Sequence, residues 1–201
     1  GFIVYQVLPA QRNAAFQQRI GWLFIVSSIA NIGWLFAWHY GFYVVSVVFM
    51  LALLVTLIAI YMGLRIGRPH AAENWQQKLF VHVPFSLYMG WITVATIANI
   101  ASVSAYLGWD GFGIAGPVWA VIMMAVAAVV VGLLFLQRSD PAYSGVLIWA
   151  LFGIRAAQAD TPLVANSALI IAGIIAVLTL IAWTRTMRQP QRSSAAQIQA
   201  A

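Results

Sequence analysis

The chain has 201 residues, of which 63% are hydrophobic and only 7% are charged. A soluble globular protein carries about 25% charged residues, so a chain this apolar is expected to be an integral membrane protein. The net charge of +6 comes from basic residues in loops and in the tail, the normal membrane pattern, and no nucleic-acid partner is expected. The absence of cysteine excludes disulfides, thiolate metal sites and cysteine nucleophiles.

Apolar segments predict the order of the helices. Residues 1–8 read as the last turns of a helix whose start lies upstream, because they lack the basic front of a signal peptide. A spanning helix needs about 20 residues, with a range of roughly 17–25. The segments that reach this length are 20–38, 43–64, 79–107, 117–137 and 162–184. The segment 142–154 is apolar but shorter, which by itself suggests a re-entrant or buried helix.

The basic residues decide whether segment 142–154 crosses the membrane. If it does, nine of the ten Lys and Arg residues lie on one side and only Arg155 lies on the other. If it does not, the split is seven to three, which fits the positive-inside rule less well. We therefore expect an all-α, polytopic transmembrane bundle with six full spans, a cytoplasmic C-terminus and a polar tail over 188–201. With the first helix completed upstream, the intact protein would have seven spans.

Two of the expected helices carry a polar and aromatic stripe. Helical spacing aligns Tyr88, Trp91, Ala95 and Asn99 on one face of segment 79–107. Segment 20–38 repeats the arrangement, and both stripes contain the sequence Ile-Ala-Asn-Ile. We therefore predict that these two helices face each other across the bundle interior. The candidate ligand-binding residues are Asn31, Trp34, Trp38, Tyr88, Trp91, Ala95 and Asn99.

Two interpretations of these stripes remain open. A buried amide must be hydrogen-bonded in hydrocarbon, so the asparagines can simply join helices, each bond contributing about 0.6 kcal/mol. Alternatively, the tryptophans wall a ligand pocket in which the amides orient a polar edge. Small residues at helical spacing on the later helices, namely Ala125, Ala128, Gly132, Ala168, Ala172 and Ala176, allow close packing within the bundle or against another protein.

The sequence lacks the residues that several functional classes of membrane protein require. His39 and His82 are expected at opposite ends of their helices, about 30 Å apart, so they cannot be two axial ligands of one haem. The only lysine, Lys78, lies in a loop, which excludes a retinal Schiff base in the last helix. No acid–base pair, catalytic triad or phosphate loop is visible, so we expect neither an enzyme nor a metal site. An ion-coupled transporter is disfavoured because the acidic residues fall in loops: Glu73, Asp110, Asp140 and Asp160.

Two motifs resemble one known family. Segment 23–36, with Asn31 and Trp34, resembles the "Leu-Asn-x-x-Trp…Phe-Phe" helix of the tryptophan-rich sensory protein / translocator protein (TspO/MBR) family. Segment 84–99 resembles that family's last helix, "Pro-Tyr-x-x-Trp-x-x-x-Ala-x-x-x-Asn", with Trp91, Ala95 and Asn99 at matching spacing. Alanine stands at 30 and 98, where the family has leucine. The family has five helices and binds porphyrins, haem and, in mitochondria, cholesterol inside the bundle.

The resemblance implies a division of the chain and a function. Residues 1–107 would form the TspO-like core, and 108–187 would add transmembrane helices, as in an extended bacterial branch of the family located in the inner (plasma) membrane. The implied activity is that of a sensor or carrier that binds a hydrophobic small molecule, with porphyrin, haem or a related pigment as the implied ligand. The alternative is a non-catalytic accessory subunit that docks through 117–184 in a larger, pigment-containing membrane complex. The expected partners are the lipid bilayer and either a second copy of the chain or other membrane subunits.

Overall fold

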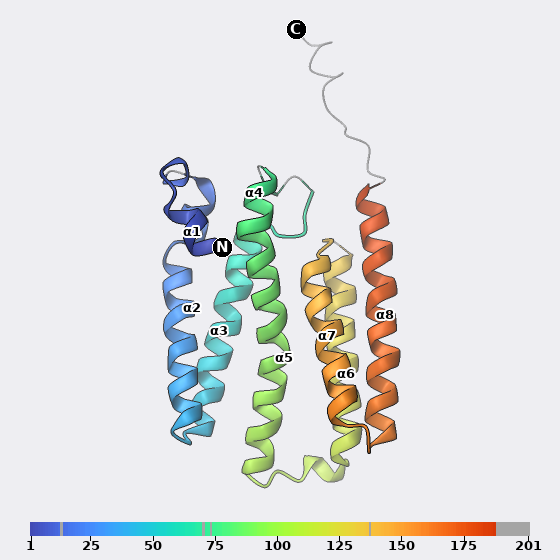
Figure 1. Ribbon diagram of the computed structural model, residues 1–201. Coiled ribbons are helices and arrows are strands. Elements are labelled where there is room, and N and C mark those ends of the chain that lie inside the picture. Colours follow the sequence, from blue (N-terminus) through green and yellow to red (C-terminus); the bar gives the residue numbers. More distant parts are fainter. Residues whose placement is uncertain (13, 70, 73, 137, 188–201) are drawn as a thin grey trace.

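The computed structural model describes residues 1–12, 14–69, 71–72, 74–136 and 138–187. Within these ranges the chain forms helices and no strands, so the prediction of an all-α membrane bundle is confirmed (Figure 1). The elements are α1 (Phe2–Val7), η1 (Pro9–Gln11), α2 (Ala15–His39), α3 (Tyr43–Gly63), α4 (Trp75–Gln77), η2 (Lys78–His82), α5 (Val83–Tyr106), η3 (Gly111–Gly113), α6 (Gly116–Phe135), α7 (Pro141–Ala157) and α8 (Pro162–Met187).

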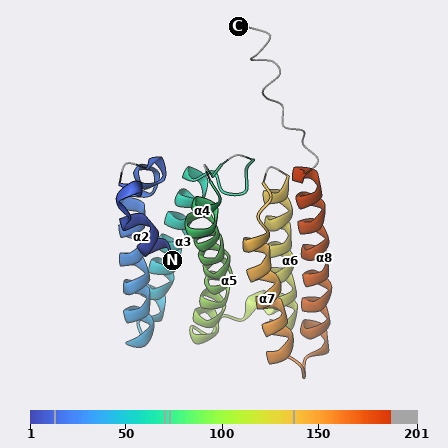
Figure 2. The ribbon, with the colours of Figure 1, turned by 45° about the horizontal axis from the view of Figure 1, so that its top comes forward.

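Five helical stretches are long and apolar enough to cross a membrane. They are α2, α3, the continuous stretch from α4 through α5, α6 and α8. The stretch Trp75–Tyr106 has 32 residues. At 1.5 Å per residue it exceeds the roughly 30 Å of a hydrocarbon core, as its sequence predicts. Helix α7 has 17 residues, at the lower limit for a span, and runs alongside α6 and α8 (Figures 1 and 2).

Helix ends differ from the predicted ends for local reasons. Helix α2 begins at Ala15 rather than at 20, and Gly21, with φ of 41°, bends it near its start. Helix α7 begins one residue before the predicted start, where the Asp140 carboxylate accepts hydrogen bonds from the backbone N–H groups of Ala142 and Tyr143 as an N-cap. At its other end it continues through 155–157, beyond the apolar stretch.

The basic residues gather at one end of the bundle. Successive long helices run antiparallel, so the connections 8–14, 64–74 and 136–140 share one end with the last turn of α8 (Figure 1). We call this the basic end. The described basic residues at this end are Arg12, Arg19, Arg65, Arg68, Lys78, Arg138 and Arg185. Arg155 lies at the opposite end, as the sequence predicts when α7 crosses the bundle.

Helix α3 lies between α2 and α5 in both views (Figures 1 and 2). It packs on α2 along one side and on α5 along the other. Helices α2 and α5 approach each other near the basic end, where the Phe24 and Phe85 rings are 6.1 Å apart. Phe2 of α1 completes this contact, at 5.2 Å from Phe24 and 5.0 Å from Phe85. The predicted face-to-face pairing of α2 and α5 is thus limited to this region, because α3 occupies the space between them elsewhere.

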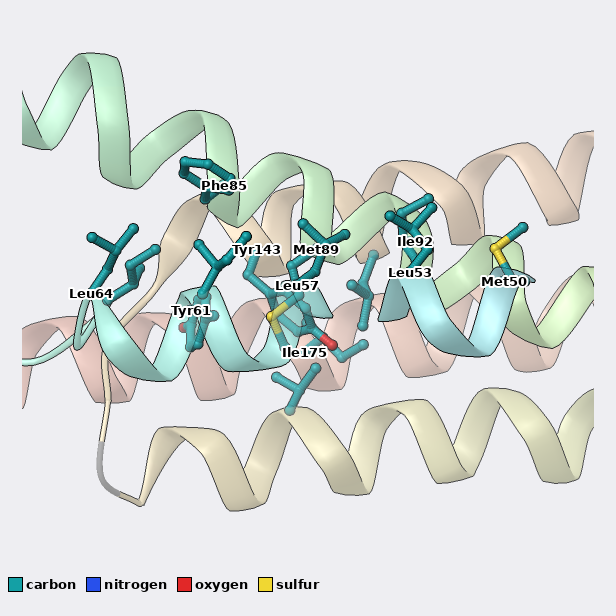
Figure 3. Close-up of a cluster of buried hydrophobic side chains, with 14 of the residues drawn as sticks. Met50, Leu53, Leu57, Tyr61, Leu64, Phe85, Met89, Ile92, Tyr143 and Ile175 are labelled. Carbon is teal, nitrogen blue, oxygen red and sulfur yellow. The ribbon is translucent and has the colours of Figure 1, made fainter. Parts of the chain in front are cut away.

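The core follows one stripe of α3. Met50, Leu53, Leu57 and Tyr61 recur every three or four residues and are at most 1% exposed. The stripe faces α5, and side chains from α7 and α8 extend the cluster (Figure 3). Large apolar side chains elsewhere on the helices are exposed, which suits helices that contact a lipid bilayer.

Candidate functional site

A cavity of about 680 Å³ lies between α5, α6 and α7, toward the end opposite the basic end. Helix α5 contributes one face, on which Val94, Ile97, Ala98, Ala101 and Ala105 recur at helical spacing. Helix α6 and helix α7 supply the opposite walls, and α8 contributes two apolar side chains. The small side chains on α5 keep the cavity open, because alanine at these positions cannot reach α6.

Aromatic rings form the mouth of the cavity. The Trp109 ring lies 5.4 Å from the Trp119 ring and 5.4 Å from the Phe112 ring. The Trp119 indole N–H donates a hydrogen bond to the carbonyl oxygen of Gly111, with 2.9 Å between Nε1 and O. This bond ties the first turns of α6 to the turn η3 and holds Trp119 beside Trp109.

The turn η3 requires glycine. Gly111 and Gly113 have φ of 66° and 75°, in the left-handed region that glycine adopts without steric cost. A Cβ on Gly111 would lie 2.9 Å from the Trp119 Nε1 atom, so a side chain there would push the indole away. Phe112 also has a positive φ, of 57°, and the Asp110 Oδ1 atom accepts its backbone N–H at 3.0 Å.

Polar groups in the cavity are confined to the same end. Among the described residues that line it, Asp110 is the only charged one, and Ser104 and Gln158 add polar side chains near the mouth. The deeper walls are aliphatic or carry methionine, at Met123 and Met124. Such a cavity can hold an apolar molecule and contact a polar substituent only at its mouth.

None of the seven candidate residues from the sequence lines this cavity. Trp91 is 48% exposed and packs against Trp149 of α7, with ring centroids 5.5 Å apart. Asn31 is exposed, while Tyr88 and Ala95 are half-buried. The cavity uses a different face of α5 from the stripe that the sequence singles out.

The other three candidate residues belong to a second group of side chains around the ends of α2, α3 and α5. Trp34 stacks near Trp38 at 6.5 Å, and Trp38 meets the Tyr43 ring at 5.2 Å. The Asn99 amide Nδ2 donates to the Ser46 hydroxyl at 3.2 Å. The Trp34 indole N–H and the Asn99 Oδ1 atom are buried without a hydrogen-bond partner among the described residues. The hydrogen bond from Asn99 to Ser46 favours the interpretation that Asn99 joins α5 to α3. The unpartnered Trp34 N–H and Asn99 Oδ1 are positions at which a ligand or water could bind.

Asp140 is the buried acid that sequence reasoning missed. It lies in a loop by sequence, yet it is only 6% exposed. Its Oδ2 atom accepts hydrogen bonds from the hydroxyls of Tyr61 (2.9 Å) and Ser86 (2.7 Å). Together with the two N–H groups that it caps on α7, it joins α3, α5 and α7 at the basic end. Tyr61, Ser86 and Asp140 are far apart in the sequence, so no local pattern predicts that their side chains meet.

Arg138 lies beside this carboxylate. It is 6% exposed, donates to the Ile66 carbonyl at 2.8 Å, and its guanidinium lies 5.4 Å from the Tyr61 ring centroid. Burial lowers the pKa of the Arg138 side chain. His82 is also buried, and its Nε2 atom has no partner in the described structure. The described residues contain no group of three or more His, Asp or Glu side chains that could hold a metal ion.

These features define a class of protein: a polytopic helical membrane protein with an apolar cavity between its helices. A family model described as "TSPO-like protein" matches residues 1–181, and the chain belongs to this family. The match runs past residue 107 and includes α6, α7 and most of α8, so these helices are part of what the family model describes. The division at residue 107 stays a prediction. Comparison with curated proteins and with solved structures gave no match.

Proposed function

We propose that this TSPO-like protein binds an apolar small molecule in the cavity between α5, α6 and α7, and acts as a sensor or carrier rather than as an enzyme. The observation that supports this proposal is the cavity itself. Its volume of about 680 Å³ falls within the roughly 300–1,000 Å³ that is usual for small-molecule sites. Its walls are almost wholly apolar, with a few polar groups at one end, as expected for a site that orients a hydrophobic ligand.

A tetrapyrrole is the ligand that the family resemblance implies. No histidine of the described chain lines the cavity, so a haem there would have no imidazole ligand from these residues. A porphyrin ring would depend on apolar contact with the walls and on stacking against Trp109 or Trp119. Protoporphyrin is therefore a necessary test ligand, and a neutral apolar probe is needed beside it.

We also propose a bacterial inner membrane as the location, with the basic end and the C-terminus in the cytoplasm. The clustering of described basic residues at one end supports this orientation, because cytoplasmic loops carry an excess of Lys and Arg. A reporter fused to the C-terminus and assayed for cytoplasmic activity tests it. Activity only on the outer side of the membrane would contradict the orientation.

Binding can be measured through tryptophan fluorescence, because a brominated alkyl chain quenches indoles that it contacts. In neutral detergent micelles, 2-bromoundecanol should quench the wild-type protein saturably through Trp109 and Trp119, because its bromine is next to the hydroxyl that the polar end of the cavity would hold. Ala101→Phe should abolish this component by filling the cavity. Ala52→Phe is the matched control, because Ala52 is exposed on α3 and does not line the cavity.

One result would overturn the proposal that the cavity binds a ligand. If neither 2-bromoundecanol nor protoporphyrin gives saturable quenching that Ala101→Phe removes and Ala52→Phe retains, the cavity is not a ligand site. Measuring the thermal unfolding of both variants shows whether a lost signal reflects lost folding instead of a filled cavity.

The second candidate function is that of a docked accessory subunit. The observation that favours it is the exposure of α6, in which only Met124 and Val131 are buried. The small residues at Ala168 and Ala172 argue for packing within the bundle, because both are buried against neighbouring helices. Gentle purification followed by mass measurement of the intact assembly tests docking. A single chain with bound small molecules would contradict it.

A further inference from the structure

The polar and aromatic groups of the cavity are gathered at its mouth. This asymmetry indicates a ligand with a polar head at that end and an apolar body. Trp109 and Trp119 line the cavity beside Asp110, Phe112 packs on the Trp109 ring outside the lining, and Ser104 and Gln158 are the other polar residues of a wall that is otherwise apolar. We propose that the cavity selects an amphiphile whose apolar body lies between α5, α6 and α7 and whose positively charged amine or quaternary ammonium head lies at Asp110. This inference rests on the proposed function and adds the chemical class of the ligand.

Two independent interactions favour a cation at this position. Aromatic faces attract cations through their quadrupoles, and tryptophan does so best. Clusters of aromatic rings are accordingly a common means of recognising quaternary ammonium groups. A carboxylate beside such rings adds a direct charge interaction. The Asp110 Oδ1 atom is used by the Phe112 N–H, and its Oδ2 atom has no hydrogen bond within the described chain, so one oxygen can face a ligand head.

The other charged groups at this end do not cancel the preference. Arg155 and Asp160 belong to the end of α7 and the following loop, and neither lines the cavity. His39 ends α2 and is likewise absent from the lining. The only formal charge on the described cavity wall is therefore negative. An anionic head, including the carboxylates of a porphyrin, would meet like charge at the mouth.

A set of three probes, each with its bromine on the carbon next to the head group, tests the inference: 2-bromoundecyltrimethylammonium, 2-bromoundecanol and 2-bromoundecanoate. A bromine at this position lies beside Trp109 and Trp119 when the head is at Asp110. Each is titrated into wild-type protein in neutral micelles, and the quenching of Ala101→Phe is subtracted to remove partitioning into the micelle. We expect the cation to bind about tenfold more tightly than the alcohol, because a surface charge pair and one cation–π contact each contribute a modest factor. The carboxylate should bind most weakly.

Asp110→Asn is the decisive variant, because its amide oxygen can still accept the Phe112 N–H and the turn keeps its shape. It should reduce the cation's preference over the alcohol from about tenfold to about threefold, the share of the cation–π contact, and leave the alcohol unchanged, since only the charge is removed. Asp160→Asn is the matched control, an acid at the same end that does not line the cavity. It should leave the preference intact.

The outcomes separate this inference from the proposed function. Equal binding of cation and alcohol to the wild-type protein, or a preference that Asp110→Asn leaves undiminished, overturns the charged-head inference while the cavity remains a ligand site. Absence of Ala101→Phe-sensitive binding by every probe overturns the proposed function itself. Adding phosphatidylcholine to the micelles identifies the source of the head group. Competition with the cationic probe supports a lipid headgroup as the occupant, and undiminished probe binding supports a free amphiphilic cation.

Discussion

Replacing Asp140 by alanine should destabilise the protein more than any other single change of a loop residue. The carboxylate accepts four hydrogen bonds: two from the hydroxyls of Tyr61 and Ser86, and two from backbone N–H groups at the start of α7. Each buried hydroxyl left without an acceptor costs about 1–3 kcal/mol. The lost N-cap costs about 1 kcal/mol more. Some relief comes when a freed hydroxyl bonds to a backbone carbonyl of its own helix, so we expect a net loss of about 3–5 kcal/mol.

The assay is thermal unfolding in neutral detergent, followed by circular dichroism. For a chain of this size a loss of 1 kcal/mol lowers Tm by about 2–4 °C, so Asp140→Ala should lower Tm by roughly 10 °C. Asp140→Asn retains one of the two acceptor oxygens and should lower Tm less. Asp160→Ala, at an exposed acid, is the control and should change Tm by about 1 °C or less. A shift for Asp140→Ala no larger than that of the control would refute the view that this carboxylate joins α3, α5 and α7.

Four further predictions concern the cavity, the core and the candidate residues. Gly111→Ala should weaken 2-bromoundecanol quenching severalfold and leave the far-ultraviolet spectrum unchanged, because a Cβ there displaces the Trp119 indole; unchanged binding would mean that Trp119 does not shape the mouth. Leu57→Ala should lower the free energy of unfolding by about 2–5 kcal/mol, since the Leu57 side chain is 1% exposed. Leu180→Ala is the control and should cost far less, because Leu180 is 57% exposed. Equal losses in thermal unfolding would contradict the assigned core. Trp91→Ala should leave cavity binding within about twofold, because Trp91 packs against Trp149 outside the cavity; complete loss of quenching would return the ligand to the predicted stripe. Tyr61→Phe should cost about 1 kcal/mol in the same unfolding assay, as one hydrogen bond to Asp140 is removed; a loss as large as that of Asp140→Ala would show that the four bonds are not separable.

Periodicity and charge predicted the helices well because both are local properties of the chain. Apolar stretches of spanning length need no partner to be recognised, and the bilayer constrains their length. The same holds for α7, which the distribution of basic residues assigned as a sixth crossing helix although it was apolar over only 142–154. In the structure its start is capped by Asp140, a bond between a side chain and the backbone just after it, and its other end continues to Ala157. Such a cap can be anticipated in sequence where an Asp precedes Pro at a helix start.

The candidate site was harder to predict, because a stripe on one helix does not say which neighbour it meets. Residues on the predicted face of α5 are divided in the structure: Asn99 bonds to Ser46 of α3, and Trp91 packs against Trp149 of α7. The cavity is lined instead by the alanines of another face. Small apolar residues are typical both of tight helix packing and of an open cavity, and only the distance to the facing helix distinguishes them.

The sequence by itself determined that this is a helical membrane protein, the order of its long apolar helices, and a basic end opposite Arg155, because hydrocarbon thickness and charge act on each segment separately. The family also follows from matched motifs along the chain. Only the tertiary structure decided that α3 separates α2 from α5, that Asp140 is buried among Tyr61 and Ser86, and that the space between α5, α6 and α7 stays open. These features depend on side chains far apart in sequence that meet only when the helices have packed.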